Sequence, residues 1–174
     1  LNKYKFNTVI TACPHCFHTL SNEYPDFGGH YDVVHHSEFI QKLLDEGKLD
    51  PEKSMDGNVT YHDACYLGRH NDIYEAPRNV LDSVLSEDSN YIELEQSKSS
   101  SFCCGAGGGN MWHEDNKGER VNVARMEQII DSGADKVATA CSFCVIMMDD
   151  AMKVKGKENE MVVQDIAEII AERL

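Results

Sequence analysis

Two adjacent cysteines, Cys103 and Cys104, stand directly before a run of glycines in the stretch "FCCGAGGGN". Neighbouring cysteines close a disulfide ring only with strain, and their sulfurs hardly reach the same small ion. The chain has seven cysteines, and the others are Cys13, Cys16, Cys65, Cys141 and Cys144. Tight pairs of this kind, in a chain that we expect to be cytoplasmic, indicate metal or redox chemistry rather than a secreted disulfide framework.

Five of these cysteines form a regular series. Cys65 is followed after 37 residues by the adjacent pair, and 36 further residues lead to the CxxC motif of Cys141 and Cys144. Each position follows a predicted strand or leads into a helix, and the carboxyl ends of parallel strands meet at one edge of a sheet. Five thiolates exceed the four donors that satisfy zinc and the four of a plain cubane [4Fe-4S] cluster. The series therefore predicts a multinuclear iron-sulfur core of irregular shape, in which adjacent cysteines reach different irons.

The glycines after the pair support the same interpretation. Gly105 and Gly107, with the two glycines that follow, allow the backbone to approach a bulky core, and their amides can stabilise negative charge. A phosphate-binding loop is the alternative, but "GAGGGN" lacks both the GxGxxG spacing and the GK[ST] ending. The CxxC motif alone would also fit a thioredoxin-like dithiol, and it is the three additional cysteines that argue against this.

Short β-rich runs alternate with amphipathic stretches along the whole chain, which predicts an α/β fold. We expect a Rossmann-like, mostly parallel sheet with helices on both faces. The predicted strands are 8–12, 31–36, 58–63, 90–95 and 136–140, and the predicted helices are 37–47, 75–86, 119–133, 142–154 and 163–174.

An internal repeat suggests how the chain is organised. "VITACPHC" at 9–16 matches "VATACSFC" at 137–144, each followed by a helical stretch and a strand that starts with two valines. We therefore predict that residues 1–50 are the tail of one unit and that residues 51–174 are a whole unit. The upstream half of the first unit would belong to a longer protein.

Charge and hydropathy exclude several partners. Thirty acidic against sixteen basic residues give a formal charge of −14, and no cluster of Lys and Arg stands out. Nucleic acids and anionic membrane surfaces require a positive face, so neither is an expected partner. No apolar run approaches the roughly 20 residues of a membrane helix, so attachment to the inner face of a membrane would need sequence outside this chain.

The motifs "YHDACYLGRH", "CCGAGGG" and "ATACSFC" together resemble the cysteine-rich CCG domain of iron-sulfur oxidoreductases. That family includes the B subunit of heterodisulfide reductase and the iron-sulfur subunits of glycolate and lactate oxidases. Other stretches, such as "TACPHCFHTLSNEYPDFGG", look closest to the branch associated with electron-transferring flavoproteins and quinone reduction. The resemblance covers nearly the whole chain; one departure is Ser142, where the family commonly has proline.

The resemblance implies a cofactor, a role and partners. It implies a non-cubane [4Fe-4S] cluster held by Cys65, Cys103, Cys104, Cys141 and Cys144, which passes electrons between a flavoprotein-type donor and a quinone or disulfide acceptor. Cys13 and Cys16 would be ligands of the truncated first unit, left without their partners. The expected partners are an upstream ferredoxin-like domain, a first CCG domain, and an electron-transferring flavoprotein or another redox subunit; an isolated fragment would be inactive.

Two other functions remain open from the residues alone. One is a structural or docking module that holds zinc with four of the five cysteines, or at Cys13 and Cys16 with His15 or His18. The other is a cluster-free thiol oxidoreductase working through the second CxxC motif. We also expect His62 or His70, which flank Cys65 in the sequence, to donate hydrogen bonds to a sulfur.

Overall fold

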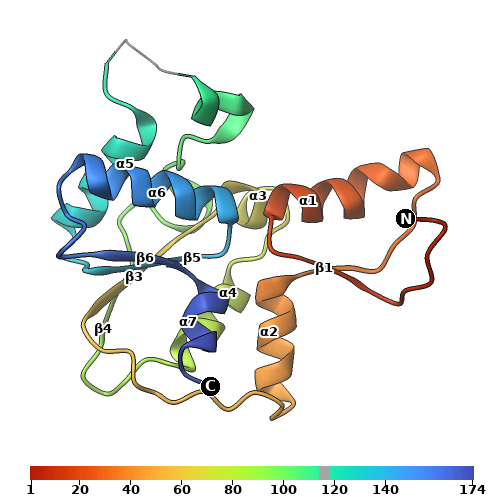
Figure 1. The fold of residues 1–174 in the computed structure, drawn as a ribbon, viewed down its shortest axis with the longest axis horizontal. Helices are drawn as coiled ribbons and strands as arrows, with labels where there is room; N and C mark the ends of the chain where they lie inside the picture. Colours follow the sequence, from red (N-terminus) through yellow and green to blue (C-terminus); the bar gives the residue numbers. More distant parts are fainter. Residues whose placement is uncertain (114–117) are drawn as a thin grey trace.

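A computed structural model of the chain describes residues 1–113 and 118–174, and its strands form parallel sheets (Figure 1). Within these residues the larger sheet has the order β4-β3-β5-β6, and a separate small sheet pairs β1 with β2. All of these strand pairs are parallel. The strands are β1 (Val9–Thr11), β2 (Val33–His35), β3 (Asn58–His62), β4 (Asn90–Ile92), β5 (Lys136–Thr139) and β6 (Val162–Asp165).

Helices lie on both faces of the larger sheet. Figure 1 shows α5 and α6 on one face and α4 and α7 on the other, with α2 beside α4 and α7. The helices are α1 (Pro14–His18), α2 (His36–Asp45), α3 (Cys65–Gly68), α4 (Glu75–Asp82), α5 (Val121–Asp131), α6 (Ser142–Val154) and α7 (Ile166–Ala171). A π-helical turn (Thr19–Glu23) and a 3₁₀ turn (Tyr24–Phe27) continue α1, and further 3₁₀ turns cover Lys98–Ser100 and Gly107–Trp112. None of the described helices is long and apolar enough to cross a membrane.

The predicted α/β fold, with helices on both faces of a parallel sheet, is confirmed. All five predicted strands are present, in shorter form, and the helix predicted at 142–154 has those bounds. The prediction of a helix over 163–174 is wrong at its start, because Val162–Asp165 pairs with β5 as an edge strand. Asp165 then begins α7 with a capping box, in which its carboxylate accepts from the Ala167 N–H and Glu168 accepts from the Asp165 N–H.

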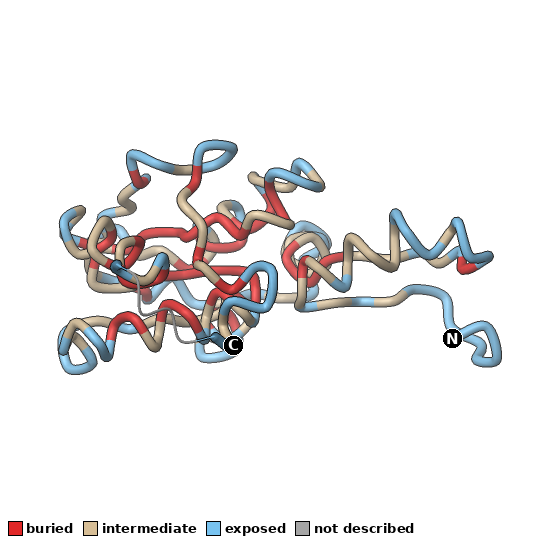
Figure 2. The backbone as a smooth tube through the Cα atoms, turned by 90° about the horizontal axis from the view of Figure 1, so that it is seen from above, coloured by how far each residue is buried: buried red, intermediate tan, exposed pale blue. Residues whose placement is uncertain are grey.

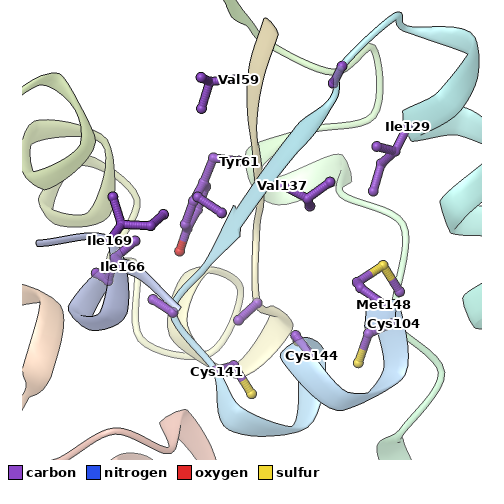
Figure 3. Packing of buried hydrophobic residues seen from close by; sticks show 14 of the residues in the cluster. Val59, Tyr61, Cys104, Ile129, Val137, Cys141, Cys144, Met148, Ile166 and Ile169 are labelled. Carbon is purple, nitrogen blue, oxygen red and sulfur yellow. The ribbon is translucent and has the colours of Figure 1, made fainter. Parts of the chain in front are cut away.

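The core follows from the alternation of side chains along the central strands. Val59 and Tyr61 of β3 lie on the side of α7, near Ile166 and Ile169 (Figure 3). Because successive side chains of a strand point to opposite faces, Thr60 and His62 face α5 and α6 instead. Buried backbone is concentrated around this sheet, whereas the N-terminal part is mostly intermediate or exposed (Figure 2).

The sequence repeat corresponds to a repeat of structure. The order strand, CxxC, helix, strand, helix occurs as β1-α1-β2-α2 and again as β5-α6-β6-α7. Thr11 pairs with His35 in the first copy and Thr139 pairs with Asp165 in the second, and both partners cap the helix that follows. The copies touch where Nε2 of His36 lies 2.8 Å from Oδ1 of Asp165.

The buried cap His35 predicts a pH dependence of stability. Burial and then the neighbouring His36 lower the pKa of His35 to about 3, against an ordinary value of 6.5. The unfolded chain therefore binds a proton at His35 below pH 6.5, whereas the folded chain does not accept it until near pH 3. The contribution of His35 to the free energy of unfolding is therefore complete above pH 6.5 and is lost as the pH falls. We expect the free energy of unfolding of the metal-free chain, measured in urea, to decrease on acidification.

The control for this prediction is His35→Asn, which keeps a good helix cap but cannot titrate. Its free energy of unfolding should fall less steeply between about pH 6 and pH 4. The slope should be smaller by about 1.4 kcal/mol per pH unit, because the unfolded variant has one proton fewer to bind. Equal slopes for the two proteins would contradict the burial of a neutral His35.

Candidate metal centre

The five cysteines of the series lie past the carboxyl ends of β3, β4 and β5. Cys65 begins α3 two residues after Asp63, and Cys141 is the residue before α6, which contains Cys144 in its first turn. Cys103 and Cys104 lie in the segment that joins β4 to α5. Figure 3 shows Cys104, Cys141 and Cys144 gathered around the start of α6.

The thiols of these cysteines meet. Cys104, Cys141 and Cys144 are buried, and the other two are half-buried. Neighbouring cysteines shift one another's pKa along one series, in the order Cys65, Cys103, Cys104, Cys144 and Cys141, so consecutive thiols of the series lie close together. The structure thus brings together residues that span eighty positions of the sequence, as the edge rule for parallel strands predicts.

Crowding divides the thiols into two groups. The pKa of Cys103 falls to about 2, because Cys104 and Cys65 hydrogen-bond to it and the Gly105 N–H donates to its sulfur over 3.3 Å. The pKa of Cys141 falls to about 5, chiefly through Cys144. The pKa values of Cys65, Cys104 and Cys144 are raised, in each case first by the neighbouring cysteine. Thiols this close cannot all ionise without a cation, which is the condition that a metal centre meets.

This division predicts different reactivities for two equally half-buried thiols. In the metal-free chain Cys103 should be alkylated by iodoacetamide at about pH 6 much faster than Cys65, because the thiolate is the nucleophile. Peptide mapping by mass spectrometry after short exposures would measure both rates in one sample. Faster labelling of Cys65 would contradict the opposite directions of the pKa shifts of these two thiols.

The loop after the pair uses glycine for two different reasons. Gly105 has φ +84°, and a Cβ there would lie 3.0 Å from Cβ of Val121 and 3.2 Å from N of Asn122. Gly108 and Gly109 also have positive φ. At Gly107 a Cβ would meet no described atom within 4 Å, so sterics do not require glycine there, and a role of Gly107 in cofactor binding stays a prediction.

An ion pair fixes the segments that carry Cys65 and Cys103. The carboxylate of Asp63, just past β3, accepts from both terminal nitrogens of Arg78 at 2.8 and 2.9 Å and from the Lys98 N–H at 2.8 Å. Ser101 donates to the Asp63 carbonyl oxygen. Because Lys98 and Ser101 precede Cys103, this one residue joins both segments. The pattern "YHDAC" gave no sign of this role.

Of the two histidines expected near the sulfurs, the structure places His62 beside two of them. A ring nitrogen of His62 lies within 4.8 Å of the sulfurs of Cys104 and Cys144, and all three residues are buried. Its pKa is lowered to about 3, by burial and then by the charge of Arg125, so the ring is neutral. His70 is exposed and stacks on Tyr66 with ring centroids 4.2 Å apart.

The first CxxC pair lies beside the second through His15. Nδ1 of His15 is 3.9 Å from Sγ of Cys13, and the same side chain contributes, after Cys144, to the low pKa of Cys141. The His15 ring also stacks on Tyr66 at 4.0 Å. His18 points elsewhere, with Nδ1 3.1 Å from Oδ1 of Asn71. The repeat of the CxxC motif could have indicated this proximity, but the bridging role of His15 had no separate signal.

Comparison with known proteins agrees with the cysteine pattern. Residues 59–149 match the family model described as CCG, cysteine-rich domain. The chain is 41% identical, over 97% of its length, to the EtfAB:quinone oxidoreductase of Syntrophomonas wolfei. It is 38% identical over 94% of its length to the probable iron-sulfur-binding oxidoreductase FadF of Bacillus subtilis. It is 32% identical, over its whole length, to one subunit of the dihydromethanophenazine:CoB–CoM heterodisulfide reductase of Methanosarcina barkeri.

The chain covers a minor part of each of these relatives. It spans 24% of the first, 23% of the second and 42% of the third.

Proposed function

Since the chain belongs to the CCG family of cysteine-rich domains, we propose that it binds a [4Fe-4S] cluster of non-cubane shape through Cys65, Cys103, Cys104, Cys141 and Cys144. The observation that carries this proposal is the meeting of five thiols whose pKa values diverge in both directions. Thiolates are the donors that iron-sulfur clusters use. A plain cubane takes one thiolate for each of its four irons, so the fifth thiol fits an irregular core better than a cube.

The surroundings fit an anionic sulfur-rich group. Most of the set is buried, and the Gly105 N–H already points at a sulfur. When bound, such a cluster supplies one-electron redox chemistry. The role of the chain is then to hold the thiolates, exclude water and stabilise negative charge at the sulfurs.

We further propose a redox partnership. Relatives are named as an EtfAB:quinone oxidoreductase and as part of a heterodisulfide reductase, which supports transfer between a flavoprotein-type donor and a quinone or disulfide acceptor. The low coverage of these relatives supports further segments in the whole protein, and we propose from the family resemblance that a ferredoxin-like domain and a first CCG unit are among them. On this proposal residues 1–50 are the tail of the first unit, with Cys13 and Cys16 as its last ligands, and residues 51–174 are the second unit. The protein would work in the cytoplasm or at the inner face of a membrane.

A zinc site is the alternative that one observation favours. His62, Cys104 and Cys144 offer three buried donor atoms within 4.8 Å of one another. However, Nδ1 of His62 accepts a hydrogen bond from Nε of Arg125 at 3.2 Å. A neutral imidazole that accepts at Nδ1 carries its proton at Nε2, so neither nitrogen is free to ligate. Metal-ligating histidines show the opposite pattern and donate from their second nitrogen.

Metal analysis distinguishes the iron-sulfur cluster from the zinc site. The chain should be reconstituted anaerobically with iron and sulfide, and a parallel sample should be offered zinc. We expect about four irons with acid-labile sulfide and a brown colour that dithionite partly bleaches. One tightly held zinc, with no iron and no colour, would establish the structural module instead.

A further inference from the structure

Arg125 of α5 is a cation with an unusual environment. Its side chain is completely buried, at 0% exposed. Nε donates to Nδ1 of His62 at 3.2 Å, and Nη1 donates to Oε1 of Gln128 at 2.8 Å. Among the described residues Nη2 has no hydrogen-bond partner. Both partners are neutral groups, so no described carboxylate hydrogen-bonds this guanidinium.

A buried charge of this kind needs a compensating charge. The buried carboxylate of Asp63 is already bound by both terminal nitrogens of Arg78. Glu93 is paired with Arg78 as well. Glu93, Glu95 and Asp131 line, together with Arg125, a cavity of about 380 Å³ that is open to solvent, and solvent screens their charges. Two charges act on Arg125, first that of Asp63 and then that of Cys144, and Cys144 is a thiol that becomes a thiolate when it ligates a metal.

The hydrogen bond from Arg125 determines which nitrogen of the His62 ring carries the proton. A guanidinium only donates, so Nδ1 of His62 must accept and the neutral ring keeps its single proton at Nε2. A ring nitrogen of His62 is within 4.8 Å of the sulfurs of Cys104 and Cys144. Arg125 therefore fixes the tautomer that has an N–H to offer, and it polarises that N–H with its own positive charge.

We propose that Arg125 and His62 form a buried electrostatic relay behind Cys104 and Cys144, which stabilises added negative charge on the cluster and so raises its reduction potential. This rests on the proposed function, because it assumes the cluster. Arg125 and His62 are positioning residues in this scheme, and neither is an iron ligand.

The test is a redox titration followed by EPR on the reconstituted chain. Arg125→Gln removes the charge but keeps polar atoms. Reduction of the cluster in this variant should become roughly tenfold less favourable, which is a shift of about 59 mV to more negative potential for a one-electron couple. Arg125→Lys keeps the charge and should retain most of the wild-type potential. The matched control is Arg120→Gln, which removes a partly exposed arginine paired with Asp150 at the start of the same helix and should leave the potential unchanged.

The outcomes separate this inference from the proposed function. If the wild type binds no iron, the proposed function fails. If all variants bind equal iron and Arg125→Gln has the wild-type potential, the relay is wrong and the cluster assignment stands. Nitrogen-15 NMR of the His62 ring in the wild-type chain gives a test that needs no variant. A proton at Nε2 is expected, and a proton at Nδ1 would overturn the relay.

Discussion

Cys144→Ser will lose most of the iron that the reconstituted wild-type chain holds, whereas Cys16→Ser will keep it. The two cysteines occupy the same place in the repeated CxxC motif, 128 residues apart. Cys144 is buried, and its neighbours Cys104 and Cys141 in the thiol series both raise its pKa. Cys16 is exposed and lies outside that series. A serine hydroxyl is a much poorer ligand for iron than a thiolate, so only the first replacement removes a central ligand.

Iron and acid-labile sulfide, measured per folded chain, would test this difference. Each substitution replaces one cysteine sulfur by a hydroxyl oxygen. Circular dichroism of each metal-free variant shows whether it still folds. Equal iron in both variants would show that the five cysteines do not act as one set. Loss of iron from Cys16→Ser alone would move the metal centre to the first CxxC motif.

Arg78→Met will destabilise the metal-free chain by about 3–5 kcal/mol, the usual cost of leaving a buried charge without its partner. Arg78 and Asp63 are 11% and 4% exposed, and their two parallel hydrogen bonds form a bidentate pair. The guanidinium also lies over the Tyr61 ring, 5.2 Å from its centroid, and it binds Glu93. Because Asp63 fixes the segments that carry Cys65 and Cys103, the variant should also bind iron more weakly.

The matched control is Arg120→Met. Arg120 pairs with Asp150 at 3.2 Å, but both side chains are more than a third exposed, and such pairs contribute about 0–1 kcal/mol. Urea unfolding followed by circular dichroism gives both free energies. A similar small loss in the two variants would show that the Asp63 pair has no special role in holding the cysteine segments.

The sequence was sufficient for the features that depend on local pattern. Runs such as "VITA" and "KVATA" are β-branched and short, so they predict strands correctly, and the CxxC repeat predicts the recurring order of elements. The convergence of five thiols followed from a topological rule, because any parallel sheet brings the carboxyl ends of its strands together.

Features that depend on tertiary contacts were not predictable in the same way. The repeat predicts a strand from Val162, but a helical pattern covers the same residues, and it is the pairing of Val162–Asp165 with β5 that decides between the two. Asp63 and Arg78 are separated by 15 residues and look like ordinary surface charges until the turn after β3 is seen. The burial of Arg125 was predictable from the sequence, because this residue shares the buried stripe of α5 with Met126 and Ile129 at helical spacing.

The central claim is that five separated cysteines hold one cluster, and EPR combined with iron quantitation on the wild type and on Cys104→Ser tests it most directly. The account predicts about four irons per wild-type chain in a single EPR-active species, and a changed signal with less iron when Cys104 is replaced. A wild-type chain without iron, or a Cys104→Ser variant whose iron content and signal equal those of the wild type, would contradict it.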